Sequence, residues 1–267
     1  MSGTENEMTF FDHIEELRWR LIRSISAIFI FSIIAFLFKD FVFSKILFGP
    51  TKVDFPTYEF LCILSNKIGL SDAICVKEIT YKIVNLELAG QFMVHLKTSL
   101  AIGLVFAFPY LIWEIWLFIR PGLYDQEIKA SRTAIMSSAI LFFTGVVFGY
   151  YVLSPFSINF FAGYSVSDTI ENTFSLTNYI NFITMFVLLS GLMFQLPVAV
   201  FFLAKIGLVS APLMREYRKH SFVGILIIAA IITPADIGTM IIVAVPLFIL
   251  YEFSILIAKA TYKPEII

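Results

Sequence analysis

Long apolar runs, separated by polar segments, dominate the pattern of this chain. A helix needs about 20 apolar residues to cross a bilayer core of about 30 Å. Four runs reach this length: Leu21–Phe38, Phe92–Ile119, Ala134–Phe156 and Tyr179–Ala204. Two further runs, Phe222–Ile232 and Met240–Ala258, are shorter, and the first covers only about 16 to 17 Å as a helix. We therefore predict six transmembrane helices, the fifth and sixth short, with kinks at Pro109 and Pro197 in the second and fourth.

Composition places the whole chain in the membrane class. Of its 267 residues, 59% are hydrophobic and 15% are charged, so residues 1–267 are predicted to form a single all-α polytopic membrane domain. The first apolar run is long enough to span and follows about twenty mixed-charge residues, which is not typical of a cleaved signal peptide. A net charge of -1 gives no electrostatic reason to expect nucleic acid as a partner.

No known catalytic or metal-binding motif occurs in the sequence. Metalloprotease, nucleophile-elbow, phosphate-loop and paired CxxC patterns are all missing. Of the three histidines, His95 falls on the opposite side of the predicted membrane from His13 and His220, so the three cannot share a metal. We therefore expect no enzyme activity, no metal site and no cofactor.

The positions of the arginines predict the orientation of the helices. They fall in the N-terminal arm, after the second run and after the fourth run, and these regions alternate to one side of the membrane. By the positive-inside rule that side is cytoplasmic, as are both termini. Residues 1–20, 120–133 and 205–220 are then cytoplasmic, and residues 39–88 form a long external loop. The seven arginines are Arg18, Arg20, Arg23, Arg120, Arg132, Arg215 and Arg218.

The two cysteines, Cys62 and Cys75, both lie in this predicted external loop. In an oxidising compartment they would form a disulfide that closes a short loop, and two free thiols are the alternative. We expect the disulfide, with a contribution on the order of 3 kcal/mol to local stability.

The stretch FFDHIEELRWRLIRS, residues 10–24, combines an apolar stripe with a polar face. This pattern predicts a short amphipathic helix at the cytoplasmic interface that leads into the first span. Pairing between Glu16 and Arg20, four residues apart, would account for the charges by itself. The stripe is Phe10, Ile14, Leu17 and Leu21, and the polar face is His13, Glu16, Arg20 and Arg23.

Four polar side chains lie in or beside the apolar runs, where burial is expensive. Glu114 lies near the predicted cytoplasmic end of the second span, and Gln195 lies in the middle of the fourth. Asp236 lies in the external turn TPADIGT, and Glu252 interrupts the sixth span. Functional and structural roles both remain open for Glu114 and Gln195, whereas a structural role is favoured for Asp236 and Glu252.

Several motifs, in order along the chain, closely resemble those of TatC, the core receptor of the twin-arginine protein translocase. They are HIEELRWRL before the first span, LIWEIWLFIRPGLYDQE across the second span and its loop, FQLP in the fourth, and TPAD between the fifth and sixth. The resemblance implies six spans with both termini cytoplasmic in the bacterial inner membrane, arranged as a concave, glove-like bundle. It also implies a receptor that binds twin-arginine signal peptides of folded proteins, recruits TatA- and TatB-type single-span partners, contacts membrane lipid and forms homo-oligomers.

The resemblance also implies roles for individual positions. The paired arginines of the signal peptide would bind Glu16 and Glu127, and Gln195 would face a partner's transmembrane helix. Asp236 matches the acidic residue after TP. The family often has Glu at position 195 and Gln at position 114, so here Glu114 adds a carboxylate near the peptide site. The binding surface would be shaped by Arg18, Pro50, Phe118, Pro121, Leu123 and Tyr124.

The chemistry of arginine recognition fits this assignment. A carboxylate accepts two parallel hydrogen bonds from a planar guanidinium, and lysine cannot reproduce this geometry. Two consecutive arginines on an extended peptide point in different directions and require two carboxylates. No nucleotide site occurs, so we expect the proton motive force to drive export.

The main alternative is an ion-coupled secondary transporter of small solutes that uses Glu114 and Asp236. Such a transporter needs its carboxylates in a shared midplane cavity, whereas these two are predicted at opposite faces of the membrane.

Overall fold

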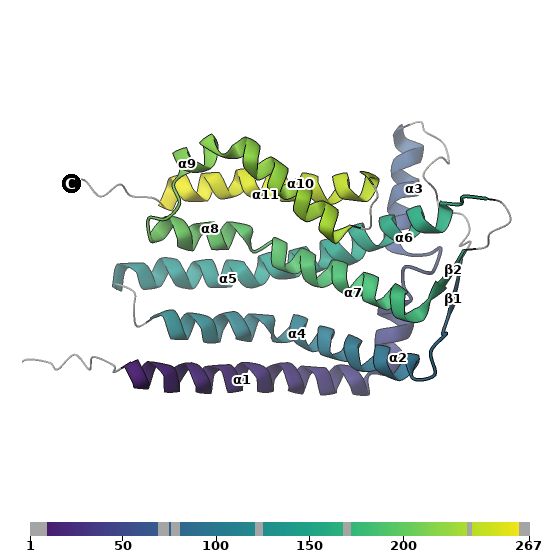
Figure 1. Cartoon of the computed structure of the whole chain (residues 1–267), viewed down its shortest axis with the longest axis horizontal. Coiled ribbons are helices and arrows are strands. Elements are labelled where there is room, and N and C mark those ends of the chain that lie inside the picture. Colours follow the sequence, from purple (N-terminus) through teal and green to yellow (C-terminus); the bar gives the residue numbers. More distant parts are fainter. Residues whose placement is uncertain are drawn as a thin grey trace, which may run out of the picture.

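The computed structural model describes residues 10–68, 75, 81–120, 125–167, 172–233 and 237–261. Most of these residues lie in helices that run side by side along the long axis of the molecule (Figure 1). The elements in chain order are α1 (Phe10–Leu37), α2 (Lys39–Phe41), the π-helix η1 (Val42–Leu47), α3 (Pro56–Ile68), β1 (Lys82–Val84), α4 (Gly90–Ile119), α5 (Asp125–Phe148), the π-helix η3 (Gly149–Leu153), α6 (Ser154–Gly163), β2 (Thr173–Ser175), α7 (Leu176–Met193), α8 (Leu196–Lys205), α9 (Ala211–Glu216), α10 (Arg218–Ile232) and α11 (Ile237–Thr261).

Five helical stretches in the described part of the chain are long and apolar enough to cross a membrane: His13–Leu37, Gly90–Ile119, Arg132–Gly163, Leu176–Lys205 and Ile237–Thr261. The remaining predicted span is α10, whose 15 residues cover only about 22 Å. Its shortness agrees with the prediction. The prediction of a short sixth span is wrong, because α11 begins before Met240 and continues past Ala258 to a length of 25 residues.

The first helix includes the stretch that was predicted to form a short amphipathic helix leading into the first span. Residues 10–24 and the first apolar run form one continuous helix, α1, of 28 residues. Residues 10–20 therefore extend the helix of the first predicted run by about three turns. Along this length α1 packs mainly against α4, as Figure 1 shows.

The third and fourth spans are irregular. In the third, α5 passes through the π-helical turn η3 into α6, so the span continues beyond the predicted end at Phe156 to Gly163. The fourth is broken between α7 and α8 at Phe194 and Gln195. Pro197 lies in the first turn of α8, where its missing N–H leaves no helical hydrogen bond unmade. This break is the structural form of the kink that the sequence predicts.

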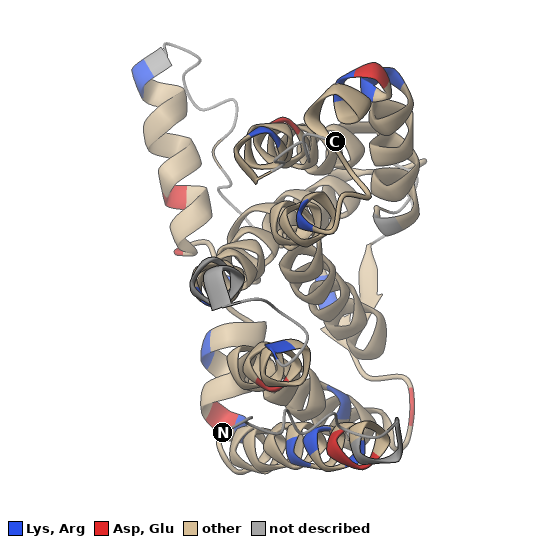
Figure 2. Ribbon diagram, turned by 90° about the vertical axis from the view of Figure 1, so that its left-hand side faces the viewer, with Lys and Arg blue, Asp and Glu red and all other residues tan. Residues whose placement is uncertain are grey.

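The bundle has two ends with different character. We call one the terminal end, at which α1 begins and α11 ends, and at which α4 ends and α5 begins (Figure 1). We call the other the loop end, which carries α3, β1 and β2. Figure 2 looks onto the terminal end: most of the ribbon is tan, and red and blue segments gather where α1 begins and around α9 and the start of α10.

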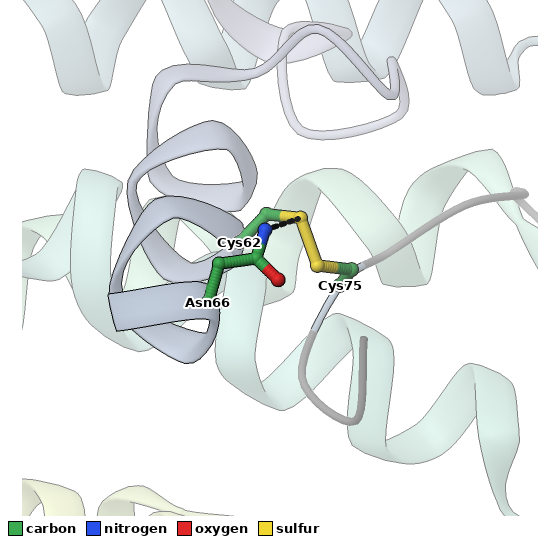
Figure 3. Close-up of a disulfide and its surroundings, with 3 residues drawn as sticks. All are labelled: Cys62, Asn66 and Cys75. Atoms are coloured by element: carbon green, nitrogen blue, oxygen red, sulfur yellow. Dashed lines mark hydrogen bonds between the residues drawn. A yellow bond between two sulfur atoms is a disulfide. The ribbon is translucent and has the colours of Figure 1, made fainter. Parts of the chain in front are cut away.

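The predicted long external loop, residues 39–88, is folded where it is described. Cys62, in α3, and Cys75 are joined by a disulfide, as the sequence predicts (Figure 3). The strand β1 pairs in parallel with β2, which precedes the fourth span, with Ile83 opposite Phe174. This small sheet ties the loop to a distant part of the chain, and nothing in the sequence pattern predicted it.

Tyrosine hydroxyls add further ties at the loop end. The hydroxyl of Tyr58, in α3, donates to the backbone carbonyl of Pro50 at 2.9 Å. Burial raises the pKa of this hydroxyl to about 12, so it stays protonated and remains a donor at neutral pH. Tyr179, in α7, donates to the carbonyl of Leu47 at 2.9 Å. The first bond stabilises the loop internally, and the second holds the loop to α7 of the bundle.

Candidate arginine-recognition site

An ion-pair cluster joins α1 to α4 at the terminal end of the bundle. Arg20 donates from Nε to Oε1 of Glu16 at 3.0 Å, and its Nη2 contacts the same oxygen. Its Nη1 donates to Oε2 of Glu114 at 3.2 Å. The helical repeat places Glu16 and Arg20 one turn apart on the same face of α1, and that face meets α4. One guanidinium therefore bridges two carboxylates on two helices.

Glu114 is the most enclosed member of this cluster. Its side chain is 5% exposed, against 16% for Arg20 and 23% for Glu16. Its other oxygen, Oε1, accepts from the hydroxyl of Tyr110 at 2.6 Å, one turn earlier on α4. A carboxylate buried in this way requires charged and hydrogen-bonding partners, and the cluster supplies both. The additional carboxylate noted in the sequence is thus held in place by Arg20 and Tyr110.

Glu16 keeps one oxygen without a partner. Oε2 is buried and has no hydrogen-bond partner among the described residues. A buried carboxylate oxygen without a donor is costly, so it is uncommon in a site whose only role is structural. The atom is an acceptor available to an additional donor.

Phe118 and His13 extend the same contact between α1 and α4. Their rings stack with centroids 4.3 Å apart. Phe118 was a predicted residue of the peptide-binding surface, and the structure places it on the same pair of helices as Glu16. Next to it, the guanidinium of Arg120 lies 5.5 Å from the ring centroid of Trp116. The end of α4 therefore presents aromatic and cationic groups near the carboxylate cluster.

Arg18 lies on a different face of α1. It forms an exposed ion pair with Glu15 at 3.4 Å, and the same carboxylate accepts from the indole N–H of Trp19 at 3.0 Å. An exposed pair of this kind contributes little to stability. Glu15 is thus engaged on this outer face, away from the cluster around Glu16.

Several predicted site residues cannot be compared with the structure. Pro121, Leu123, Tyr124 and Asp236 lie outside the described residues. Glu127 lies in the first turn of α5, at the terminal end, but its side chain is outside the described part of the chain. Its proximity to Glu16 stays a prediction.

Pro50 does not belong to this cluster. The prediction that it shapes the same surface as Glu16 is therefore corrected. It is fully buried between η1 and α3, at the loop end, with its carbonyl bonded to Tyr58. Figure 1 shows α3 at the opposite end of the bundle from the start of α1. The length of the α1 span separates the two, so Pro50 has a packing role at the loop end.

Gln195 and Glu252 each make contacts between helices. At the break between α7 and α8, Gln195 donates from Nε2 to the carbonyl of Ser138 at 3.1 Å and accepts from its hydroxyl at 2.5 Å. Glu252, on α11, forms an ion pair with Arg218 at 2.7 Å. Both side chains thus link helices within the chain, which agrees with the structural role favoured for Glu252.

Three cavities in the described part of the chain do not include Glu114, one of the two carboxylates that a transporter would use. A cavity of about 810 Å³ at the loop end is lined by Lys39, Asp40 and His95, among others. Two smaller apolar cavities measure about 270 and 340 Å³. Glu114 lines none of the three, and it is paired with Arg20 instead. No observation in the described part of the chain favours the transporter alternative.

The link between Arg20 and Glu114 escaped the sequence analysis. The two residues are 94 positions apart, and periodicity within α1 predicts only the pair with Glu16. The available signal was a single carboxylate in one apolar run and an arginine at the edge of another, both requiring a partner in a nonpolar setting.

The fold and the site define a multi-pass helical membrane protein with a buried carboxylate cluster between its first two spans. Comparison with known families assigns it further. The family model described as "Sec-independent protein translocase protein (TatC)" matches residues 12–246. The chain therefore belongs to the TatC family, whose members are components of a protein translocase and not enzymes.

Individual relatives agree with this assignment. The TatC protein of Blattabacterium sp. subsp. Periplaneta americana is 42% identical over 99% of this chain and 100% of its own length. TatCy of Bacillus subtilis is 32% identical over 97% of this chain and 92% of its own. A solved structure described as "Crystal Structure of Twin Arginine Translocase Receptor- TatC in DDM" superimposes with a TM-score of 0.73 at 31% identity, over 92% of this chain and 99% of that one.

Proposed function

We propose that this chain is the receptor subunit of a twin-arginine translocase and that Glu16 binds one arginine of the signal peptide. The observation that carries the proposal is the buried Oε2 of Glu16, which has no donor among the described residues. A guanidinium that reached this oxygen would satisfy it and add a charge-assisted hydrogen bond. The similar solved structure is that of a protein described as a twin arginine translocase receptor, which supports the same role here.

Glu127 is the proposed partner of the second arginine. It lies in the first turn of α5, and this helix begins at the terminal end, where Glu16 also lies (Figure 1). A carboxylate in the first helical turn is favoured by the helix dipole. Arginines at consecutive positions of an extended peptide diverge, so carboxylates on two separate elements suit them. Phe118, stacked on His13, would border the peptide between the two.

The terminal end is proposed to face the cytoplasm of a bacterium, with the chain in its inner membrane. All seven arginines fall in segments that the topology places on that side, and the disulfide lies at the opposite, loop end. Both termini are then cytoplasmic. The concave, glove-like arrangement and the proton motive force as energy source remain part of the proposal.

Partner recruitment would take place along the lipid-facing helices. TatA- and TatB-type single-span proteins are the proposed partners, within a translocase complex that also contains further copies of this chain. At Gln195, one amide N–H donates to Ser138, and the amide carries a second N–H that a partner's helix could accept from. A contact at this break would therefore add to the internal bond without replacing it.

Site-specific crosslinking in membranes tests the receptor role. A precursor with a photo-crosslinker beside its twin arginines is expected to label this chain, and changing the arginines to lysines is expected to abolish the labelling. The combined change Glu16→Ala and Glu127→Ala should remove the arginine-dependent product, whereas Glu15→Ala, on the exposed face of α1, should retain it. Arginine-dependent labelling that survives the double change would refute the proposal.

A further inference from the structure

We propose that Arg20 is an internal occupant of the arginine site on Glu16, and that Glu114 is the carboxylate that holds Arg20 when a signal-peptide arginine displaces it. The inference rests on the proposed function, because it assigns a mechanism to the same site. It makes Arg20 and Glu114 positioning residues, which act on the ligand through Glu16.

Arg20 makes the contacts with Glu16 that a ligand arginine would make, so the two compete for this carboxylate. Two of its nitrogens are directed at a single oxygen of Glu16. This is the kind of charge-assisted contact that an incoming guanidinium would make, from the same type of side chain. While Arg20 lies there, only Oε2 of Glu16 remains without a donor, and that atom is buried. A ligand arginine must therefore move Arg20 to gain full access to the carboxylate.

Glu114 offers Arg20 a second position without exposing it to lipid. The Nη1 of Arg20 already lies 3.2 Å from Oε2 of Glu114, so rotation of the guanidinium toward α4 keeps its charge paired throughout. Tyr110 fixes the receiving carboxylate from its other side at 2.6 Å. Because a carboxylate has about four acceptor sites, Glu114 can take further donors from Arg20 while it keeps the bond to Tyr110.

The charge balance favours this exchange. The three ionised groups in contact are two carboxylates and one guanidinium, so the cluster carries a net negative charge of one unit. A ligand arginine on Glu16, with Arg20 on Glu114, would give two matched pairs. A glutamine at position 114 would accept a hydrogen bond from Arg20 but would carry no charge to hold it. Displacement of Arg20 would then leave a partly buried cation without a counter-ion, at a large cost.

Peptide binding to purified protein in lipid nanodiscs tests the exchange. The probes are a synthetic twin-arginine signal peptide and its Lys-Lys counterpart. Glu114→Gln is expected to raise the Kd for the twin-arginine peptide about tenfold, which corresponds to about 1.4 kcal/mol. Arg20→Gln combined with Glu114→Gln should restore wild-type affinity or better, because the competitor and its holding carboxylate are removed together. Arg218→Gln, at the ion pair between α10 and α11, is the matched control and should leave the Kd unchanged.

A purely structural role for the cluster predicts a different result. If Arg20 and Glu114 only hold α1 against α4, the combined variant will bind no better than Glu114→Gln alone, and that outcome would overturn the inference. Failure of the proposed function has a separate signature. In that case wild-type protein would not distinguish the two peptides, or Glu16→Gln would bind the twin-arginine peptide as tightly as wild type.

Discussion

Gly103, on α4, controls how closely α1 can approach, and its replacement by alanine should separate the two helices. A Cβ atom at this position would lie 2.7 Å from the backbone nitrogen of Ser32 and 2.8 Å from the carbonyl oxygen of Ile28, both on α1. Backbone atoms cannot turn away as a flexible side chain can. The Ser32 hydroxyl, which also lies in the way, is itself bonded to the Ile28 carbonyl at 2.7 Å.

Two opposing terms set the magnitude of this effect. Alanine is favoured over glycine in a helix interior by about 0.8–1 kcal/mol. Overpacking of a filled interface typically costs about 1–3 kcal/mol. Because two of the three close contacts at Gly103 are to backbone atoms, we expect overpacking to dominate, with a net loss of up to about 2 kcal/mol.

Thermal unfolding of purified protein, followed by tryptophan fluorescence, measures this loss. Gly103→Ala should unfold at a lower temperature than wild type. The control is Gly224→Ala on α10, where an added Cβ would meet nothing within 4 Å, and it should unfold at or above the wild-type temperature. If Gly103→Ala were as stable as wild type, or if the two variants changed stability in the same direction, the close packing of α1 on α4 would be refuted.

Two further contacts give predictions of their own. Cys62→Ser should make the loop-end segment more sensitive to protease under non-reducing conditions, because the disulfide closes a loop with a sequence separation of 13 residues. Adding Cys75→Ser to this variant should cause no further increase in sensitivity. Two alkylatable thiols in the untreated wild-type protein, detected by mass spectrometry, would contradict this. Gln195→Leu should lower stability by about 0.6 kcal/mol and by at most about 1.7, the range for hydrogen bonds between membrane helices. Because the partner is Ser138, the effect of Ser138→Ala should be largely lost in the Gln195→Leu background, and additive effects would argue against their bond.

The sequence was informative wherever a local pattern determined the structure. Apolar run length located four of the five long helices, because a spanning segment must satisfy its own backbone hydrogen bonds, and it underestimated the length of the fifth, α11. The proline at position 197 predicted the interruption beside Gln195, because proline is favoured in the first turn of a helix, whereas Pro109 lies inside the continuous helix α4. The spacing of Glu16 and Arg20 predicted their pairing, and the shared compartment of the two cysteines predicted their disulfide. Each of these predictions depends on residues close together in the chain or on the order of the spans along the chain.

What the sequence missed depends on contacts between distant segments. The three-residue strands β1 and β2 are too short to show periodicity and exist only because they pair with each other. The sequence predicted a short amphipathic helix that leads into the first span, and the structure joins the two in a single helix, α1, whose Arg20 pairs with Glu114 of α4. The pair between Arg20 and Glu114 required the packing of α1 on α4, which a single sequence does not contain.

The measurement that tests the central claim most directly is a double-mutant cycle between Glu16 and the twin arginines. The Kd values of the Arg-Arg and Lys-Lys peptides would be determined on wild-type protein and on Glu16→Gln in nanodiscs. A charge-assisted hydrogen bond contributes about 1.5–3 kcal/mol, so the wild-type preference for arginine should fall by about tenfold or more in the variant. An arginine preference that is equal in the two proteins would contradict the assignment of Glu16 as the receptor carboxylate.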